Sequence, residues 1–336
     1  MLLVKKKINK NILREPAKKL PEVTEEMWLK VNEDYRSLVE EYISTQSLSP
    51  DSKKQYTSCL KQFGWYICNS MQNKPFYKLT KRDYLRYLSF IRDNRKMSSS
   101  AISLRKASVS SLCNYIENIV AEDDENYRTF RNFTRGLPAI PKNRVYEKVK
   151  VTKDEYDLMM SVLEDDENYL GMAWLATAFR VGARRSEIIQ FKTEILDYEV
   201  PEGQTYVVTH NVRGKGRGDD GKILQYMVPL DVLPHLKKWI EVRGYEHEHI
   251  FTTKYNGQID KMSQTWADDF CANTLSDILE RRINVHIFKN SCITHLLESG
   301  VDINLVSKYV AHHENISTTQ IYDLRDFEEE KNQIFG

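Results

Sequence analysis

The spacing of apolar residues divides the chain into a helical first part and a mixed second part. Between residues 27 and 120, apolar side chains recur every three or four positions, which is typical of amphipathic helices. One such pattern runs from about Met27 to Thr45 and a second from Lys53 to about Met71. Two more helices are expected to begin near Leu79 and after Ser98. We expect four or five helices here, packed into a compact domain.

The helical pattern stops before Pro138 and Pro141. Residues 127–150 lack apolar periodicity and carry seven Lys or Arg against one acid, Glu147. This composition predicts an extended basic linker. The predicted organisation is therefore a basic arm (1–26), a helical domain (27–126), a basic linker (127–150) and a second domain with a C-terminal docking tail (151–336).

The second domain mixes helices with short strands. Thr152 followed by Glu155 has the spacing of a capping box and predicts a new helix. Strand-like runs at 204–209 and 224–228 flank the segment RGKGRGDDGK, which predicts an antiparallel hairpin. Further helices are expected at 153–164, 168–180, 232–242 and 262–281, and two more with a short third across 286–322. The predicted fold class is mainly α with a small antiparallel β-sheet.

Composition favours a soluble protein without disulfides or metal. Hydrophobic residues make up 41% and charged residues 29% of the 336 residues, and no apolar run approaches the roughly 20 residues of a membrane span. With no secretory signal at the N-terminus, we expect a cytoplasmic location and no membrane partner. Five scattered cysteines contain no CxxC pair, and His247 with His249 is more typical of a solvated turn than of a metal site.

Charge is distributed unevenly along a chain whose net charge is only +1. Residues 1–20 hold seven Lys or Arg against one acid, Glu15, and the linker is similarly basic. Segregated basic segments favour contact with a polyanion, although a solvated tail and a solvated linker remain the alternative.

Several polar residues are not explained as ordinary solvent-exposed surface residues. Arg184 follows a Gly at a predicted helix junction, and Lys215 lies between two glycines of the predicted hairpin. His286 and Lys289 are close to one helical turn apart and share a face. Tyr322 follows His312 by ten residues. We interpret His295 as a packing or capping residue and His313 as a surface or supporting residue, and the absence of a GxxxxGK pattern argues against nucleotide binding.

These residues, in this order, resemble the tyrosine recombinase (phage integrase) family. The family's TGLRxSE-like box is VGARRSE here and contains Arg184; its GKGxxR-like hairpin followed by VPL is GKGRG…MVPL and contains Lys215. Its HxLRHTxATHLLExG box is HIFKNSCITHLLESG, with His286, and its LGHxxxxTTxxY box is VAHHENISTTQIY, with His312 and Tyr322. The resemblance implies a helical SAM-like core-binding domain plus a mixed α+β catalytic domain.

The resemblance also implies a reaction. In this family a Tyr hydroxyl attacks a DNA phosphate, forming a 3′-phosphotyrosyl bond and a free 5′ hydroxyl. A phenol with pKa near 10 needs its proton removed and the developing charge stabilised, which cationic side chains accomplish. A Lys can protonate the leaving oxygen. No cofactor or metal is implied.

Two positions depart from the family. Its second Arg is Lys289 here, and the next residue, a family His, is Asn290. Lys keeps the charge but loses the bidentate fork of Arg. Loss of one donor from such a site typically lowers the rate about 10²–10³-fold.

The leading hypothesis is a site-specific recombinase or integrase of phage or mobile-element type with Tyr322 as nucleophile. It would bind double-stranded DNA at an inverted-repeat site, associated with the nucleoid, as a homotetramer, and be a monomer or weak oligomer in free solution. The alternatives are a sequence-specific DNA-binding regulator with weakened or lost catalysis and, less favoured, a type IB topoisomerase-like enzyme. The expected catalytic residues are Arg184, Lys215, His286, Lys289, His312 and Tyr322. The expected DNA-binding residues are Arg105, Lys106, Arg128, Arg131, Arg135, Lys142 and Arg144.

Overall fold

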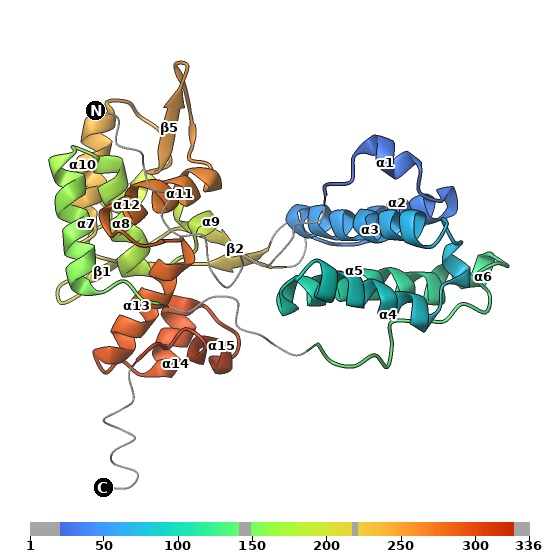
Figure 1. Cartoon of the computed structure of the whole chain (residues 1–336). Coiled ribbons are helices and arrows are strands. Elements are labelled where there is room, and N and C mark those ends of the chain that lie inside the picture. Colours follow the sequence, from blue (N-terminus) through green and yellow to red (C-terminus); the bar gives the residue numbers. More distant parts are fainter. Residues whose placement is uncertain (1–20, 141–148, 217–220, 326–336) are drawn as a thin grey trace, which may run out of the picture. The chain divides into compact units, whose positions relative to one another are not determined.

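The computed structural model describes residues 21–140, 149–216 and 221–325, which form two separate compact units (Figure 1). The described part of the first unit is 21–140, and that of the second is 149–216 with 221–325. The expected arm up to residue 20, Lys142 and Arg144 of the linker, and the docking tail after Arg325 lie outside the described residues. Each unit has its own hydrophobic core.

The first unit is entirely helical in its described part. Polar side chains begin its four longest helices: Asn32, Ser49, Thr80 and Ser98 each accept a backbone hydrogen bond from the first turn. The elements are α1 Glu25–Leu29, α2 Glu33–Thr45, α3 Pro50–Ser70, α4 Lys81–Ser89, α5 Ser99–Tyr115 and α6 Ala121–Asp123, with a 3-10 turn at Phe76–Lys78 and π-helical turns at Phe90–Asn94 and Ile116–Val120.

The single helix predicted from Met27 to Thr45 is two helices. The side chain of Asn32 accepts a hydrogen bond from the Tyr35 amide and starts α2, and the Asn32 amide is bound by the side chain of Asn73. A capping side chain therefore interrupts an apolar pattern that is otherwise continuous.

An aromatic core holds this unit together. Tyr35 stacks on Phe76 with ring centroids 5.0 Å apart and donates its hydroxyl to the Leu60 carbonyl at 2.9 Å. Tyr127, Phe130 and Phe133, which follow α6, are buried in the same core. The predicted linker start at 127 is thus too early, because these aromatic side chains belong to the helical unit.

The second unit combines helices with three pairs of short strands. Its helices are α7 Lys153–Asp165, α8 Tyr169–Val181, α9 Arg185–Ile188, α10 Leu233–Arg243, α11 Gln264–Phe270, α12 Ser276–Ile278, α13 His286–Glu298, α14 Ile303–Leu305 and α15 Ile316–Gln320, with a 3-10 turn at Thr193–Leu196 and π-helical turns at Cys271–Leu275 and Val306–Ala311. Its strands are β1 Tyr206–Val208, β2 Val212–Gly214, β3 Lys222–Leu224, β4 Met227–Pro229, β5 Thr252–Tyr255 and β6 Gln258–Lys261.

The strands pair only in antiparallel twos. β1 pairs with β4 and β2 with β3, so the one predicted hairpin is in fact two successive ladders. β5 and β6 form a third hairpin, which the sequence reasoning missed. Its turn is Asn256-Gly257, both with positive φ, and an Asn-Gly pair is the signal that would have found it.

Helix α8 runs through the centre of the second unit and fixes the start of the candidate site. It is buried on nearly all sides and packs against α7, α10 and α13. It ends at Gly182, whose φ is +67°, and a Cβ there would approach the Cys292 sulfur to 3.0 Å. Only glycine suits this close, left-handed turn, which brings the following Arg184 beside α13.

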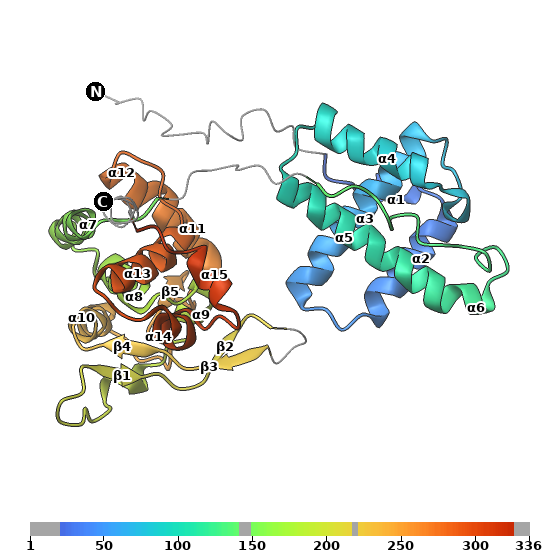
Figure 2. The same cartoon turned by 90° about the horizontal axis from the view of Figure 1, so that it is seen from below.

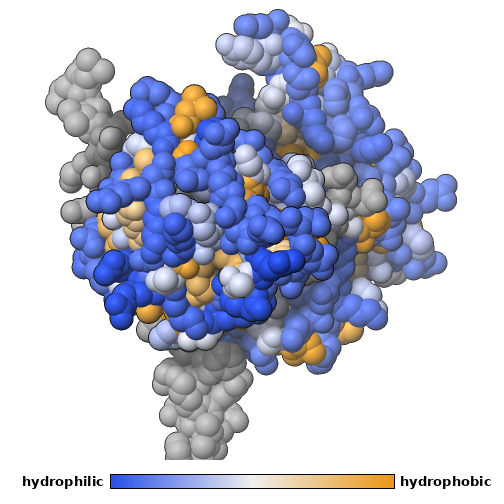
Figure 3. Space-filling model, turned by 90° about the vertical axis from the view of Figure 1, so that its right-hand side faces the viewer, coloured by the Kyte–Doolittle hydropathy of each residue, from blue (hydrophilic) through white to orange (hydrophobic). Residues whose placement is uncertain are grey.

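Among the residues described, no helix is both long and apolar enough to cross a bilayer. The face shown in Figure 3 is predominantly hydrophilic, with small separate hydrophobic areas.

Candidate active site

The last helices of the second unit carry four of the six expected catalytic residues. Helix α13, the π-helical turn Val306–Ala311 and α15 pack together in sequence, as Figure 2 shows at the red end of the chain. Buried Ile293, Leu297, Val306 and Ala311 form a small core among them, and Tyr322 packs against it. The regular apolar positions of 286–322 therefore form a platform that holds the polar residues between them.

A buried carboxylate orients Arg184. Glu187 is fully buried; it accepts the Arg184 backbone N–H at 2.6 Å and the guanidinium at 3.0 Å. The Glu187 carboxylate also accepts a hydrogen bond from the Tyr226 hydroxyl at 2.6 Å. Burial alone would raise the pKa of Glu187, but the Tyr226 hydrogen bond and the charge of Arg184 outweigh it and lower the pKa. Arg184 is thus fixed by a charged group rather than by solvent.

Lys289 is buried beneath the site, with 3% of its surface exposed. Its ammonium donates a hydrogen bond to the Ala311 carbonyl at 3.0 Å. Burial, and then the charge of Arg184, lower the pKa of Lys289 to about 8, against an opposing effect of Glu187. Lys289 therefore places a positive charge near Arg184 while it also binds the backbone.

His312 occupies a left-handed turn directly after that carbonyl. Its φ is 52° and its ψ 41°, and its ring meets Tyr226 edge-on at 4.7 Å between centroids. Its buried Nε2 has no hydrogen-bond partner among the described residues. Burial and then Lys289 lower the pKa of His312, and Arg184 acts in the same direction. A neutral ring with an available nitrogen thus lies within the electrostatic reach of both cations.

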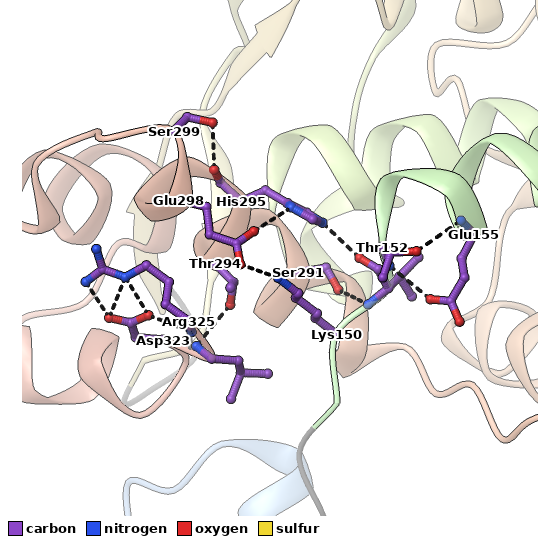
Figure 4. Close-up of polar contacts among 12 residues, drawn as sticks. Lys150, Thr152, Glu155, Ser291, Thr294, His295, Glu298, Ser299, Asp323 and Arg325 are labelled. Carbon is purple, nitrogen blue, oxygen red and sulfur yellow. Dashed lines mark hydrogen bonds and ion pairs between the residues drawn. The ribbon is translucent and has the colours of Figure 1, made fainter. Parts of the chain in front are cut away.

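Tyr322 is fastened to the same platform. The hydroxyl of Thr294, fully buried on α13, donates to the Tyr322 carbonyl at 3.0 Å and accepts the Leu324 amide at 3.3 Å. Figure 4 shows Thr294 turned toward the segment that ends at Asp323 and Arg325. The Tyr322 ring lies 5.1 Å from the ring of His313. The expected nucleophile is therefore held by its own chain.

His286 and Lys215 are less closely integrated. His286 is exposed at the start of α13, where it interacts electrostatically with Arg185, Arg184 and Lys289. Lys215 is exposed just beyond β2. In β3, Lys222 interacts electrostatically with His312 and pairs with Glu314 at 3.7 Å.

Sequence reasoning missed the supporting residues Glu187, Thr294, Tyr226 and Lys222. Glu187 and Thr294 lie inside the quoted boxes, so the boxes themselves pointed to them. Nothing in the sequence singled out Tyr226 or Lys222, because their role depends on how the two strand ladders pack.

The expected DNA-binding arginines differ in how far they are free to contact DNA. Arg105 bonds to Gln62 at 2.8 and 3.2 Å and to the Ala101 carbonyl at 3.1 Å. Arg135 pairs with Glu117 at 2.8 Å, and Arg131 binds the Phe130 carbonyl at 2.7 Å. Arg128 is exposed, and Lys106 is half-buried. Arg105 therefore joins α5 to α3 inside the unit.

The remaining histidines fit packing and turn roles. His295 contacts the Val151 carbonyl at 2.8 Å and Glu298 at 3.2 Å (Figure 4), as expected of a packing residue. His247 accepts the His249 amide at 3.0 Å. Within the described ranges, no group of three or more His, Cys, Asp or Glu side chains is placed to bind a metal.

Comparison with known proteins identifies the family. The sequence profile described as "Phage integrase family" matches residues 150–329. The chain is also 63% identical over 332 residues to the SPbeta prophage-derived recombinase-like protein YomM of Bacillus subtilis, which covers 98% of this chain and 99% of that protein. The chain belongs to the phage integrase, or tyrosine recombinase, family. The resemblance inferred from the four boxes is confirmed.

More distant relatives extend over most of the chain. Tyrosine recombinase XerA of Pyrococcus horikoshii is 23% identical over 296 residues, 87% of this chain and 89% of that protein. A XerH site-specific recombinase bound to its palindromic difH substrate matches with a TM-score of 0.65 at 16% identity, over 95% of this chain and 98% of that one. The Tn1549 transposon integrase in complex with transposon right end DNA matches with a TM-score of 0.66 at 15% identity, over 90% and 98%. These structures confirm the predicted fold class of both domains.

Proposed function

We propose that this recombinase-family chain cleaves and rejoins DNA at specific sites through a 3′-phosphotyrosyl intermediate at Tyr322. The observation that carries the proposal is the gathering of Arg184, Lys289, His312 and Tyr322 around one platform in one unit. Arg184 and Lys289 interact with each other and with His312, and the nucleophile is docked on the same helices.

Each residue has a task that its environment supports. Arg184, held by Glu187, donates its fork to the nonbridging phosphate oxygens. The buried ammonium of Lys289 adds positive charge that stabilises the phosphate. His312 donates a hydrogen bond to the same phosphate. His286 contacts it from the exposed start of α13, and Lys215 protonates the leaving 5′ oxygen. No cofactor takes part in this chemistry.

The proposed substrate is double-stranded DNA with an inverted repeat, recombined by a homotetramer that is a monomer or weak oligomer when free. Support for assembly comes from exposed apolar residues that cluster on the C-terminal helices: Val301, Leu305, Tyr309, Ile316 and Ile321. A tail containing Phe327, Ile334 and Phe335 follows them in the sequence. Such a patch suits the tail of a neighbouring copy. We place the protein in the cytoplasm, on the nucleoid when it is bound to DNA.

The test is a covalent trapping assay. Random-sequence duplexes selected with the full-length protein supply the binding site, and a nicked version of that duplex traps the covalent intermediate. The wild-type chain should form a protein–DNA adduct, and Tyr322→Phe should bind the duplex equally well without forming one. Tyr255→Phe, an exposed Tyr on β5 of the same unit, is the matched control and should retain the adduct.

A second candidate is a sequence-specific DNA-binding regulator with weakened or lost catalysis. The observation that favours it is the hydrogen bond from the Lys289 ammonium to the Ala311 carbonyl. An ammonium bound there cannot form the bidentate hydrogen bonds to a phosphate that a guanidinium forms. Tight and specific binding by the wild-type chain without any adduct would favour the regulator.

A further inference from the structure

His312 occupies the glycine position of the family's fourth box, LGHxxxxTTxxY. Four residues separate the histidine of that box from its Thr pair, which is Thr318-Thr319 here, so the box histidine is His313. The expectation that His312 is the box histidine is therefore wrong. The ring of His313 lies 5.1 Å from the ring of Tyr322. The family pattern consequently assigns no role to the side chain of His312.

The backbone at His312 has the conformation that suits glycine. Its φ is 52° and its ψ 41°, in the left-handed region. Glycine adopts this conformation without steric cost, whereas a residue with a Cβ adopts it rarely. The chain therefore keeps an imidazole at a position where the backbone favours glycine. Such an unfavourable choice of residue points to a role for the side chain.

The His312 ring lies among the groups proposed to bind the phosphate. It meets Tyr226 edge-on at 4.7 Å between centroids, and the Tyr226 hydroxyl binds the Glu187 carboxylate that holds Arg184. Its Nε2 is buried and has no hydrogen-bond partner among the residues that the structure describes. A buried polar atom without a partner requires an explanation, and an acceptor supplied by a ligand is one. The charged groups that act on the ring are Lys289, Glu187, Lys222 and Arg184.

A second departure from the family, Lys289, meets His312 at the same peptide. The Lys289 ammonium donates a hydrogen bond at 3.0 Å to the carbonyl of Ala311, the residue directly before His312. At position 289 a smaller cation stands in place of the box arginine, and at position 312 a ring stands in place of the box glycine. One change removes volume and hydrogen-bond donors from the site, and the other adds both.

We propose that Lys289 and His312 are a matched pair that together replace the single arginine of the family's third box. This inference rests on the proposed function and deepens it. The ammonium supplies the positive charge. The imidazole Nε2–H donates to a nonbridging phosphate oxygen, a hydrogen bond that an ammonium bound to Ala311 does not provide in the geometry of a guanidinium. The ring also fills space that a guanidinium at position 289 would need, so each residue suits the site only in the presence of the other.

A double-mutant cycle tests the pairing. His312→Gly, Lys289→Arg and the double variant are prepared as full-length proteins, and the rate of adduct formation on the nicked duplex is measured in a single turnover. Each single variant should react at least about tenfold more slowly, His312→Gly because a phosphate donor is lost and Lys289→Arg because the site is overpacked. The double variant should react at least about tenfold faster than either single variant, because the guanidinium gains the space of the ring and binds two phosphate oxygens.

Glu280→Gly is the matched control for the backbone change. Glu280 is also left-handed, with a φ of 49°, and is exposed near α12 of the same unit. This variant should react at the wild-type rate, and it should not rescue Lys289→Arg. Melting temperature and affinity for the duplex are measured for every variant. Affinity should change little in His312→Gly, so that its slower reaction reports on the reacting phosphate and not on DNA binding.

The possible outcomes separate the pairing from the function beneath it. If the wild-type chain forms the adduct and the losses of the two single variants multiply in the double variant, the residues act independently and the pairing is overturned alone. His312→Gly at the wild-type rate overturns it equally. If the wild-type chain forms no adduct, the recombinase function is overturned and the pairing with it. An adduct formed only by the double variant would then identify the two departures as the changes that inactivate the site.

Discussion

The ammonium of Lys289 donates a hydrogen bond to the carbonyl oxygen of Ala311 at 3.0 Å. Ala311 ends a π-helical turn, and its carbonyl directly precedes His312, which is left-handed. Helix ends leave carbonyl groups without partners, and a cation suits them. A residue expected to act only on the phosphate therefore also stabilises the turn that presents His312.

This burial should give Lys289 a pH signature in stability. The pKa is about 8 in the folded chain and ordinarily 10.5. Between these values the unfolded chain binds more protons, so the free energy of unfolding should rise with pH across this window. Relative to Lys289→Met, the wild-type chain should gain on the order of 3 kcal/mol from pH 8 to pH 10.5. Denaturant unfolding at a series of pH values measures the difference.

The control for this prediction is Lys308→Met, which removes an exposed lysine of the same π-helical turn. Its difference from wild type should stay constant over the same pH range. A Lys289→Met difference that is equally constant would show that the Lys289 ammonium is hydrated as usual.

An arginine at position 289 should slow the reaction. The Lys289 side chain fills a buried space and reaches its carbonyl partner, and a guanidinium is larger than an ammonium. Overpacking of such sites typically costs about 1–3 kcal/mol. Lys289→Arg should therefore lower the melting temperature and slow adduct formation about tenfold. A faster reaction of this variant would instead identify Lys289 as a damaging replacement.

The hydroxyl of Thr294 should matter for cleavage more than for DNA binding. It bonds to the Tyr322 carbonyl and the Leu324 amide, so Thr294→Val keeps the shape and leaves both groups unpaired. A lost hydrogen bond of this kind costs about 1–3 kcal/mol. We expect adduct formation to fall about tenfold or more, with little change in affinity for the duplex.

Thr177→Val provides the comparison for that experiment. Thr177 is equally buried, but its hydroxyl bonds only to the Ala173 carbonyl of its own helix, α8. It should retain the wild-type cleavage rate per folded molecule. If Thr177→Val and Thr294→Val lose activity alike, loss of general stability explains both, and the fastening of Tyr322 by Thr294 does not.

The elements of this fold were largely predictable because local signals agreed with tertiary packing. Capping residues such as Thr80 and Thr152 begin helices where the sequence predicts them. The prediction was wrong at Asn32, where a cap interrupts an apolar pattern. It was also wrong after residue 127, where buried aromatic residues lie in non-helical segments. The spacing of apolar residues along the chain does not show that aromatic residues outside a helix are buried in a core.

The candidate site was predictable only where residue type and spacing matched a known pattern. Arg184 and Tyr322 were predicted in this way. The contacts that set their properties were not, because Glu187, Tyr226 and Thr294 act through distances between segments far apart in sequence. For the same reason the sequence predicted for Lys289 only the loss of the bidentate hydrogen bonds of an Arg. Its hydrogen bond to the Ala311 carbonyl could not be predicted, because the two residues are 22 positions apart.

Arg105 and Arg128 should respond in opposite ways to replacement by Ala. The Arg105 guanidinium is committed to Gln62 and the Ala101 carbonyl, and joins α5 to α3. Arg105→Ala should destabilise the helical unit by about 1–2 kcal/mol and leave the salt dependence of DNA binding nearly unchanged. Arg128 is exposed, so Arg128→Ala should leave stability within about 0.5 kcal/mol.

The measurement that separates the two arginines is affinity for the selected duplex over a range of salt concentrations. Each phosphate contact contributes about one unit to the slope of log K against log salt. Arg128→Ala should reduce that slope by about 1. If Arg105→Ala reduces it instead, the Arg105 side chain leaves Gln62 to contact DNA, and its bond in the free protein is a resting position.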